Sequence, residues 1–128
     1  MSLISPVNAS RAIGLSRIAF GIGMIAAPAT IGRSWLGEDG TTPGAQVALR
    51  GLGIRDLLIG MAQIHTASDP ERGYRWARTS GIGDAVDLIA TIAARKGLPA
   101  SGVYGTGALA GMAVVSSIAT SEWMRREG

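Results

Sequence analysis

Four apolar segments joined by short polar links constrain the fold of this chain more than any other feature. They cover residues 10–32, 45–66, 76–95 and 101–123, and each is about 20–23 residues long. A helix of that length can cross a hydrocarbon core of ~30 Å. None of the segments shows the alternation of a β-strand. The sequence therefore predicts an all-α fold: residues 1–128 form one domain, a four-helix transmembrane bundle.

Composition and flanking residues agree with a membrane protein. The chain is 47% apolar and 16% charged, whereas about 25% of residues are charged in an ordinary soluble protein. No charged residue lies between Lys96 and Glu122. Tryptophans at the segment ends resemble the aromatic belts of membrane proteins; they are Trp35, Trp76 and Trp123. We interpret Pro28, inside the first segment, as a kink that a membrane helix tolerates.

Positive residues at the segment ends indicate an orientation. One side of the predicted bundle carries three of them: Arg33, Arg95 and Lys96. The side of the N-terminus carries six: Arg11, Arg72, Arg75, Arg78, Arg125 and Arg126. Positive residues favour the cytoplasmic face. We therefore expect a multi-pass protein of the inner (plasma) membrane with both termini in the cytoplasm.

Other classes of protein fit the sequence less well. A soluble glycine-rich bundle is less consistent with the sequence, because the first and fourth segments lack the charged outer face that a soluble helix needs. A cleaved signal peptide also fits poorly, because "IAAPA" (25–29) is a weak cleavage site and the second segment would remain unexplained. The net charge of +3 does not indicate nucleic acid binding, because the arginines form no stripe with exposed aromatic residues. With no cysteine and only His65, we expect no metal site and no cofactor.

Six ionisable residues lie inside the apolar segments: Arg17, Arg50, Arg55, Asp56, Asp84 and Asp87. A lone charge near the bilayer centre costs ~2.5–3.5 kcal/mol on insertion scales, so we expect these residues to be paired. Matching the depth of the antiparallel second and third segments predicts that Arg55 approaches Asp87 or Asp56, and matching that of the parallel first and third segments predicts that Arg17 lies near Asp84.

Helical spacing places small and polar residues on one face of each of three segments. The faces are Ser10, Gly14, Arg17 and Gly21; Gly53, Asp56, Gly60 and Gln63; and Ser80, Asp84, Asp87 and Thr91. We expect the three faces to meet inside the bundle. Such an intramembrane cluster is a functional-site hypothesis, although Arg–Asp pairs can also simply fix helix register.

Three stretches support a family resemblance: "RGLGIRDLLIG" (50–60), "GDAVDLIA" (83–90) and "APATIGRSWLG" (27–37). Together they resemble small, poorly characterised four-helix membrane proteins of actinobacteria and some fungi, which are loosely similar to DoxX-type bundles. The shared pattern is an Arg-Asp step in the second helix followed by an Asp-x-x-Asp step in the third. The resemblance implies the four-span architecture and a role for the polar cluster, and it implies no particular reaction.

Our first functional hypothesis is a cofactor-independent membrane enzyme, an epoxide hydrolase, cyclase or isomerase that acts on a lipophilic small molecule. A carboxyl group buried among apolar side chains can act as general acid, and one held by an arginine can act as base. We expect catalysis by Asp56 or Asp84 as the acid, Asp87 as the base and Arg55 as the bridge between them. The residues expected to bind substrate are Arg17, Arg50 and Gln63.

The alternative is a non-catalytic membrane subunit, or a small proton or solute pathway, whose Arg–Asp pairs are structural. Under either hypothesis, glycine-rich helix faces such as Gly107-x-x-x-Gly111 allow close packing of helices, within the chain or between two copies of it. The two hypotheses differ in one observable. An enzyme needs a mostly apolar cavity on which the three aspartates converge, whereas a subunit needs a polar cluster without a cavity.

Overall fold

The computed structural model describes residues 4–127, and this part of the chain contains helices and no strand. The helices are α1 (Pro6–Ala26), α2 (Pro28–Leu36), α3 (Pro43–Thr66), α4 (Arg72–Ala93) and α5 (Gly107–Glu127). Short 3₁₀ turns occupy Gly37–Thr41 and Arg95–Gly97, and a π-helical segment, Ser101–Thr106, leads into α5. The predicted all-α fold is confirmed for the described residues.

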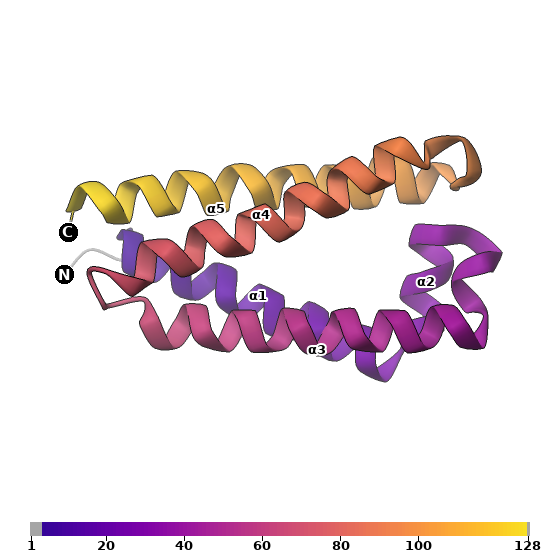
Figure 1. Cartoon of the computed structure of the whole chain (residues 1–128), viewed down its shortest axis with the longest axis horizontal. Coiled ribbons are helices and arrows are strands. Elements are labelled where there is room, and N and C mark those ends of the chain that lie inside the picture. The colour runs from indigo at the N-terminus through magenta and orange to yellow at the C-terminus, as the bar shows by residue number, and fades with distance from the viewer. Residues whose placement is uncertain (1–3, 128) are drawn as a thin grey trace.

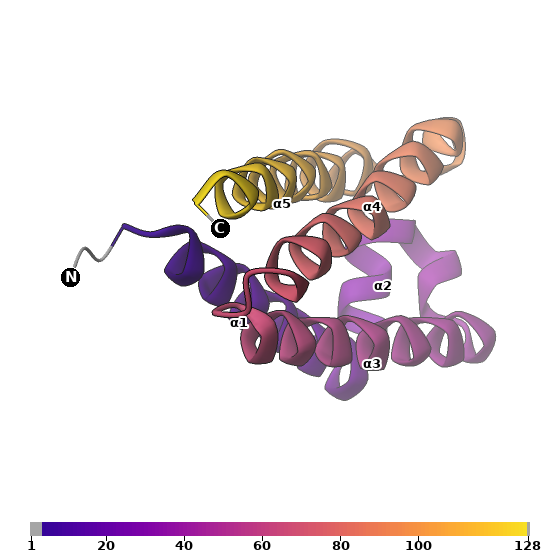
Figure 2. The same cartoon turned by 60° about the vertical axis from the view of Figure 1, so that its left-hand side comes forward.

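The four long helices form two antiparallel pairs. α1 packs against α3, and α4 packs against α5, while contacts of α1 with α5 and of α3 with α4 join the pairs. Figures 1 and 2 show the pairs as two layers, with α2 at one end of the molecule. The start of α1 and the end of α5 lie together at the opposite end (Figure 1). Residues near the two chain ends are therefore neighbours in space.

Polar side chains fix the points where the long helices begin. The side chains of Ser5 and Thr42 accept backbone N–H bonds at the starts of α1 and α3. Before α4, Asp69 Oδ1 accepts the backbone N–H groups of Glu71 at 2.9 Å and Arg72 at 3.0 Å. These two bonds hold the pKa of Asp69 below its usual range. Each cap satisfies N–H groups that have no partner within the helix.

The first apolar segment does not form a single helix, so the expectation of one kinked span over residues 10–32 is wrong. α1 ends at Ala26, and Ala27 adopts φ −135° and ψ 58°, outside the helical region. Pro28 has no N–H to continue the helix, and it becomes the first residue of α2. When the π-helical segment is counted with α5, the other three segments agree with the observed helices to within about one turn.

Glycines bring α1 and α3 into backbone contact. A Cβ atom on Gly53 would lie 2.7 Å from the carbonyl oxygen of Gly21, and one on Gly60 would lie 2.5 Å from that of Gly14. No other residue type fits at such separations without displacing a helix. These two glycine pairs therefore set the distance between the first two long helices.

The Gly107-x-x-x-Gly111 motif also packs within the chain. Cβ atoms built on Gly107 and Gly111 would each lie 4.0 Å from the side chain of Leu88 on α4. This glycine face of α5 therefore contributes to the α4–α5 pair.

The polarity of the molecule is inverted relative to a soluble domain. Among residues 4–127, the buried polar or charged residues are Ser10, Arg17, Gln63, Thr66, Ser80, Thr91, Ser117, Thr120 and Ser121. The buried hydrophobic residues are fewer: Met24, Leu49, Ala67, Ala77, Ala110 and Met124. Large apolar side chains are instead exposed on all four long helices, with Val47, Val115 and Met112 each about 70% exposed. A soluble protein rarely exposes so many large apolar side chains while burying so few.

Two helices are long and apolar enough to cross a membrane, judged by length and composition alone. They are Pro6–Ala26 and Ser101–Glu127. Only 28% and 17% of the residues in their most apolar windows are buried. Neither is therefore the enclosed core helix of a soluble domain. α3 and α4 do not meet the same criterion.

We expect Gly53→Ala to destabilise the protein and Gly51→Ala to leave it unchanged or slightly more stable. Both glycines are inside α3, but no atom lies within 4 Å of a Cβ on Gly51, whereas one on Gly53 meets the α1 backbone. Overpacking costs about 1–3 kcal/mol, while alanine gains about 1 kcal/mol over glycine in a helix. Thermal unfolding in detergent measures the difference. Equal melting temperatures for the two variants would contradict the close α1–α3 packing.

Candidate functional site

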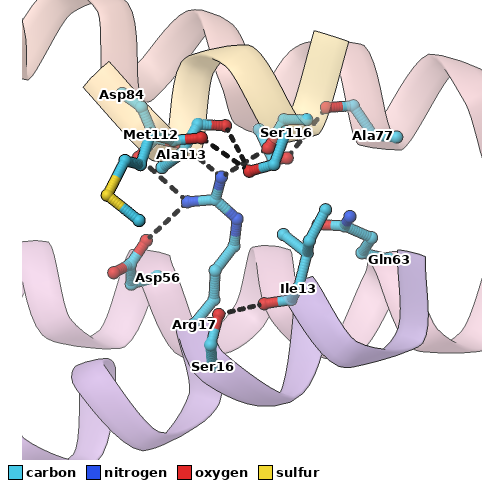
Figure 3. Close-up of polar contacts among 12 residues, drawn as sticks. Ile13, Ser16, Arg17, Asp56, Gln63, Ala77, Asp84, Met112, Ala113 and Ser116 are labelled. Atoms are coloured by element: carbon cyan, nitrogen blue, oxygen red, sulfur yellow. Dashed lines mark hydrogen bonds and ion pairs between the residues drawn. The ribbon is translucent and has the colours of Figure 1, made fainter. Parts of the chain in front are cut away.

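A buried arginine organises the polar interior. Arg17 lies near the middle of α1 and is 7% exposed. Its Nη1 donates to Asp84 Oδ1 at 3.1 Å, and its Nη2 binds the other carboxylate oxygen of Asp84. Nη2 also donates to Ser117 Oγ at 3.2 Å. Figure 3 shows the guanidinium between α1 and the helices that carry Asp84 and Asp56. The prediction that Arg17 lies near Asp84 is confirmed.

Two further carboxyl groups lie beside this pair. Asp56 Oδ1 is 3.6 Å from Arg17 Nη1, which is an ion-pair distance but too long for a hydrogen bond. Asp87 follows Asp84 by about one helical turn, and its carboxyl group forms no hydrogen bond or ion pair with any residue of 4–127. One guanidinium thus faces three carboxyl groups and can neutralise only one of them.

The three aspartates and Arg17 line one cavity of about 290 Å³. This volume is close to the lower end of the range for small-molecule pockets, ~300–1,000 Å³. Most of the remaining wall is apolar, and it comes from α1, α2, α3 and α5, whereas α4 contributes only Asp84 and Asp87. The apolar wall consists of Ile13, Phe20, Met24, Trp35, Leu52, Leu109, Ala110, Met112 and Ala113. Ser16, Thr106 and Ser116 complete the lining.

The helical period explains why these side chains meet. The expected polar faces of α1, α3 and α4 all point inward: Ser10, Gly14, Arg17 and Gly21 are buried, as are Gly53, Gly60 and Gln63, and Ser80 and Thr91. Asp56 and Asp84 retain 23% and 13% exposure because they border the cavity. The predicted meeting of the three faces is therefore confirmed.

Three of the expected site residues do not line the cavity. Arg55 is exposed and has no ion pair among the described residues, so its predicted contact with Asp87 or Asp56 is wrong. The reason is angular: adjacent helix residues are rotated by about 100°, so Arg55 cannot share the inward direction of Asp56. The arginine that contacts these carboxyl groups is Arg17 instead.

The other two lie elsewhere in the α1–α3 pair. Arg50 is exposed, and its Nε donates to the backbone carbonyl of Ile25 at 3.2 Å, which caps the end of α1. Gln63 is fully buried, and its amide nitrogen donates to Ser10 Oγ at 3.2 Å. Neither side chain is placed to bind a molecule in the cavity.

Sequence reasoning missed two contributors to the site. Trp35 lines the cavity, and its Nε1 donates to Thr91 Oγ1 at 3.1 Å, so it is not simply an interfacial anchor. Ser117 supplies an acceptor to Arg17. The spacing of small residues on α5 contained a signal for Ser117, because Ala110, Ser117 and Ser121 recur on one buried face. The position of Trp35 depends on the break at Pro28, which the sequence pattern did not indicate.

Comparison with known proteins yields no relative: no family model, no curated protein and no solved structure matches the chain. Within residues 4–127, no three histidine, cysteine or acidic side chains are grouped closely enough to hold a metal ion. The chemistry of the site has to be inferred from its geometry.

We expect Arg17→Gln to destabilise the protein by about 3–5 kcal/mol, because it leaves Asp84 buried without its cation. Arg55→Gln is the matched control, since Arg55 is exposed and unpaired among the described residues; we expect it to cause no loss of stability, because it leaves no buried charge without a partner. Thermal unfolding of detergent-purified variants compares the two. A similar loss in both variants would show that Arg17 is not the organising charge.

Proposed function

We propose that α1, α3, α4 and α5 all span a membrane. The inverted polarity supports this proposal, because large apolar side chains cover the outside of α3 and α4 as well as α1 and α5. α3 has 24 residues and α4 has 22, which gives lengths of about 36 and 33 Å, enough for a hydrocarbon core of ~30 Å. The resemblance to DoxX-type bundles contributes an architectural parallel only.

The charges of α3 are compatible with a span. Asp56 faces Arg17, and Arg50 binds a backbone carbonyl. Arg55, exposed at the middle of α3, is the costly residue, at ~2.5–3.5 kcal/mol on insertion scales. The leucine, isoleucine and valine residues of α3 contribute roughly 2–5 kcal/mol in the opposite direction. The two contributions are comparable, so Arg55 does not exclude insertion.

The arrangement of the helix ends supports the proposed orientation. The six arginines of the N-terminal side are exposed and fall near the start of α1, the start of α4 and the end of α5. These helix ends lie at the same end of the molecule (Figure 1). We therefore place both termini in the cytoplasm and the protein in the inner (plasma) membrane, following the bias of positive residues.

Single-cysteine labelling tests this topology, because the chain contains no cysteine of its own. We expect a membrane-impermeant maleimide to label Glu38→Cys and Lys96→Cys from outside intact cells, and to label Ser68→Cys only in inside-out vesicles. Glu38 and Lys96 are exposed in the α2–α3 and α4–α5 links, which lie at the end of the molecule opposite the α3–α4 link that contains Ser68 (Figure 1). Labelling of all three variants from one side, or release of the protein from membranes without detergent, would contradict the four-span proposal.

For the function, we propose an integral-membrane enzyme that uses acid–base chemistry on a lipophilic small molecule: epoxide opening, cyclisation or isomerisation. The observation that carries the proposal is the convergence of Asp56, Asp84 and Asp87 on one mostly apolar cavity, beside a single buried arginine. A purely structural Arg–Asp pair needs neither the cavity nor the two additional carboxyl groups.

The geometry favours different roles from those expected from sequence. Both oxygens of Asp84 are bound to Arg17, so this carboxylate is committed to positioning the guanidinium. Asp87 has no partner among the described residues and is free to exchange a proton with a bound molecule. Asp56 makes only the 3.6 Å contact with Arg17 and retains lone pairs for a second proton transfer. We assign Asp87 as the acid, Asp56 as the base and Asp84 as a positioning residue.

Epoxide hydrolysis illustrates how these roles balance. Protonated Asp87 gives its proton to the epoxide oxygen while the C–O bond breaks. A water molecule attacks the carbon and passes a proton to Asp56, which yields a diol. Transfer of that proton from Asp56 to Asp87 restores the starting state. In a cyclisation, a nucleophile within the substrate replaces the water, and the same two proton transfers occur.

Substitution of two neighbouring aspartates separates catalysis from stability. We expect Asp87→Asn to abolish turnover while leaving thermal stability nearly unchanged, because asparagine keeps the shape but cannot carry the proton. Asp84→Asn removes the partner of a buried arginine and should cost about 3–5 kcal/mol of stability. The measurements are melting temperature in detergent and product formation from a panel of lipophilic epoxides.

The alternative, a non-catalytic subunit or pathway, predicts a different combination of product formation and variant stability. If the parent protein converts no member of the panel while Asp84→Asn is unstable and Asp87→Asn is stable, the cluster is structural and the assignment of an enzyme falls. The observation that favours this alternative is the bidentate Arg17–Asp84 pair, because such a pair can hold helices together without taking part in a reaction.

A further inference from the structure

The cavity opens on one side only, judged by the exposure of its lining. Five lining residues are exposed, and they belong to α1 and α5: Ser16, Phe20, Leu109, Met112 and Ser116. Every lining residue from α2, α3, α4 and the π-helical segment is buried or half-buried. The opening therefore lies between α1 and α5, and we call these five residues the mouth.

The mouth lies halfway along the helices. Ser16 and Phe20 occupy the middle of α1, and Met112 and Ser116 occupy the middle of the continuous helix from Ser101 to Glu127. The exposed residues next to the mouth are also apolar, among them Leu15 and Val115. An opening at this height faces the hydrocarbon layer of a bilayer rather than either aqueous surface.

Small side chains keep the mouth open. The hydroxyl of Ser16 donates to the carbonyl of Ile13 at 2.7 Å, and that of Ser116 donates to the carbonyl of Met112 at 2.7 Å. Both serines thus satisfy their polar groups within their own helices, which makes them acceptable beside lipid. Met112 is 68% exposed, and its side chain has the flexibility to adapt to a passing molecule.

We propose that the mouth is a lateral portal through which a lipophilic ligand passes from the bilayer core into the cavity. This inference rests on the proposed membrane placement and deepens the proposed function of the same site. A ligand that enters between α1 and α5 meets Asp56, Asp84 and Asp87 inside the bundle, while Trp35 and its bond to Thr91 form part of the inner wall. The ligand is therefore a small amphipathic molecule whose polar group enters first.

Tryptophan fluorescence provides a test that needs no turnover. Replacing Trp76 and Trp123 with phenylalanine leaves Trp35, in the cavity wall, as the only tryptophan. The variant is reconstituted into vesicles and titrated with 1-bromooctane, which partitions into the bilayer and quenches on contact, or with iodide, which stays in water. We expect bromooctane to quench Trp35 strongly and iodide to quench it weakly.

Blocking the mouth supplies the decisive comparison. In the same background, Ser16→Phe and Ser116→Phe each fill the opening from one side, and we expect either to remove most of the bromooctane quenching. Ala19→Phe and Ala119→Phe are matched controls, because both alanines are exposed on the same two helices and neither lines the cavity. We expect bromooctane to quench Trp35 in these controls as strongly as in the variant that retains Trp35 alone.

Two outcomes would overturn the portal. One is equal bromooctane quenching in all four phenylalanine variants, which means that the molecule reaches Trp35 by another route. The other is iodide quenching as strong as that of bromooctane, which means that the cavity opens to water. The result is independent of the proposed reaction: if the mouth variants block quenching but no epoxide is converted, the portal stands and epoxide opening is excluded as the reaction.

Discussion

The guanidinium of Arg17 connects the two halves of this molecule. It extends from α1, in the first helix pair, to Asp84 and Ser117, which belong to α4 and α5 of the second pair. Each pair has its own close packing, whereas few direct contacts join α1 to α4. Together with the α1–α5 and α3–α4 contacts, this charged connection holds the two pairs in position at the cavity between them.

The helical repeat and the depth of residues in the predicted bundle were enough to predict part of the site. The inward faces followed from a repeat of about 3.6 residues, and the Arg17–Asp84 pair followed from matching heights in a bundle. Height alone does not specify direction around a helix axis, which is why the same reasoning failed for Arg55. Helical spacing had already placed Asp56, and not the adjacent Arg55, on the inward face of α3. Combining height with direction around the axis would have identified Arg17 as the arginine that contacts the aspartates.

Other features depended on information that no local pattern contains. Pro28 was compatible with a kink or with a break, and the break is what folds α2 back so that Trp35 can reach Thr91. The cavity lies between the two helix pairs, and its lining comes from α1, α2, α3, α4 and α5. Such a volume depends on the distances between helices that are far apart in sequence, and the glycine contacts of α1 and α3 set only one of those distances.

The position of Asp56 determines how early during synthesis the charge of Arg17 can be balanced. Arg17 leaves the ribosome long before Asp84, and an isolated arginine is the most difficult part of the first helix to accommodate. Asp56 belongs to α3, the partner of α1, and lies 3.6 Å from Arg17. The first pair thus contains its own counter-ion, and the nascent protein need not wait for its second half before that charge is balanced.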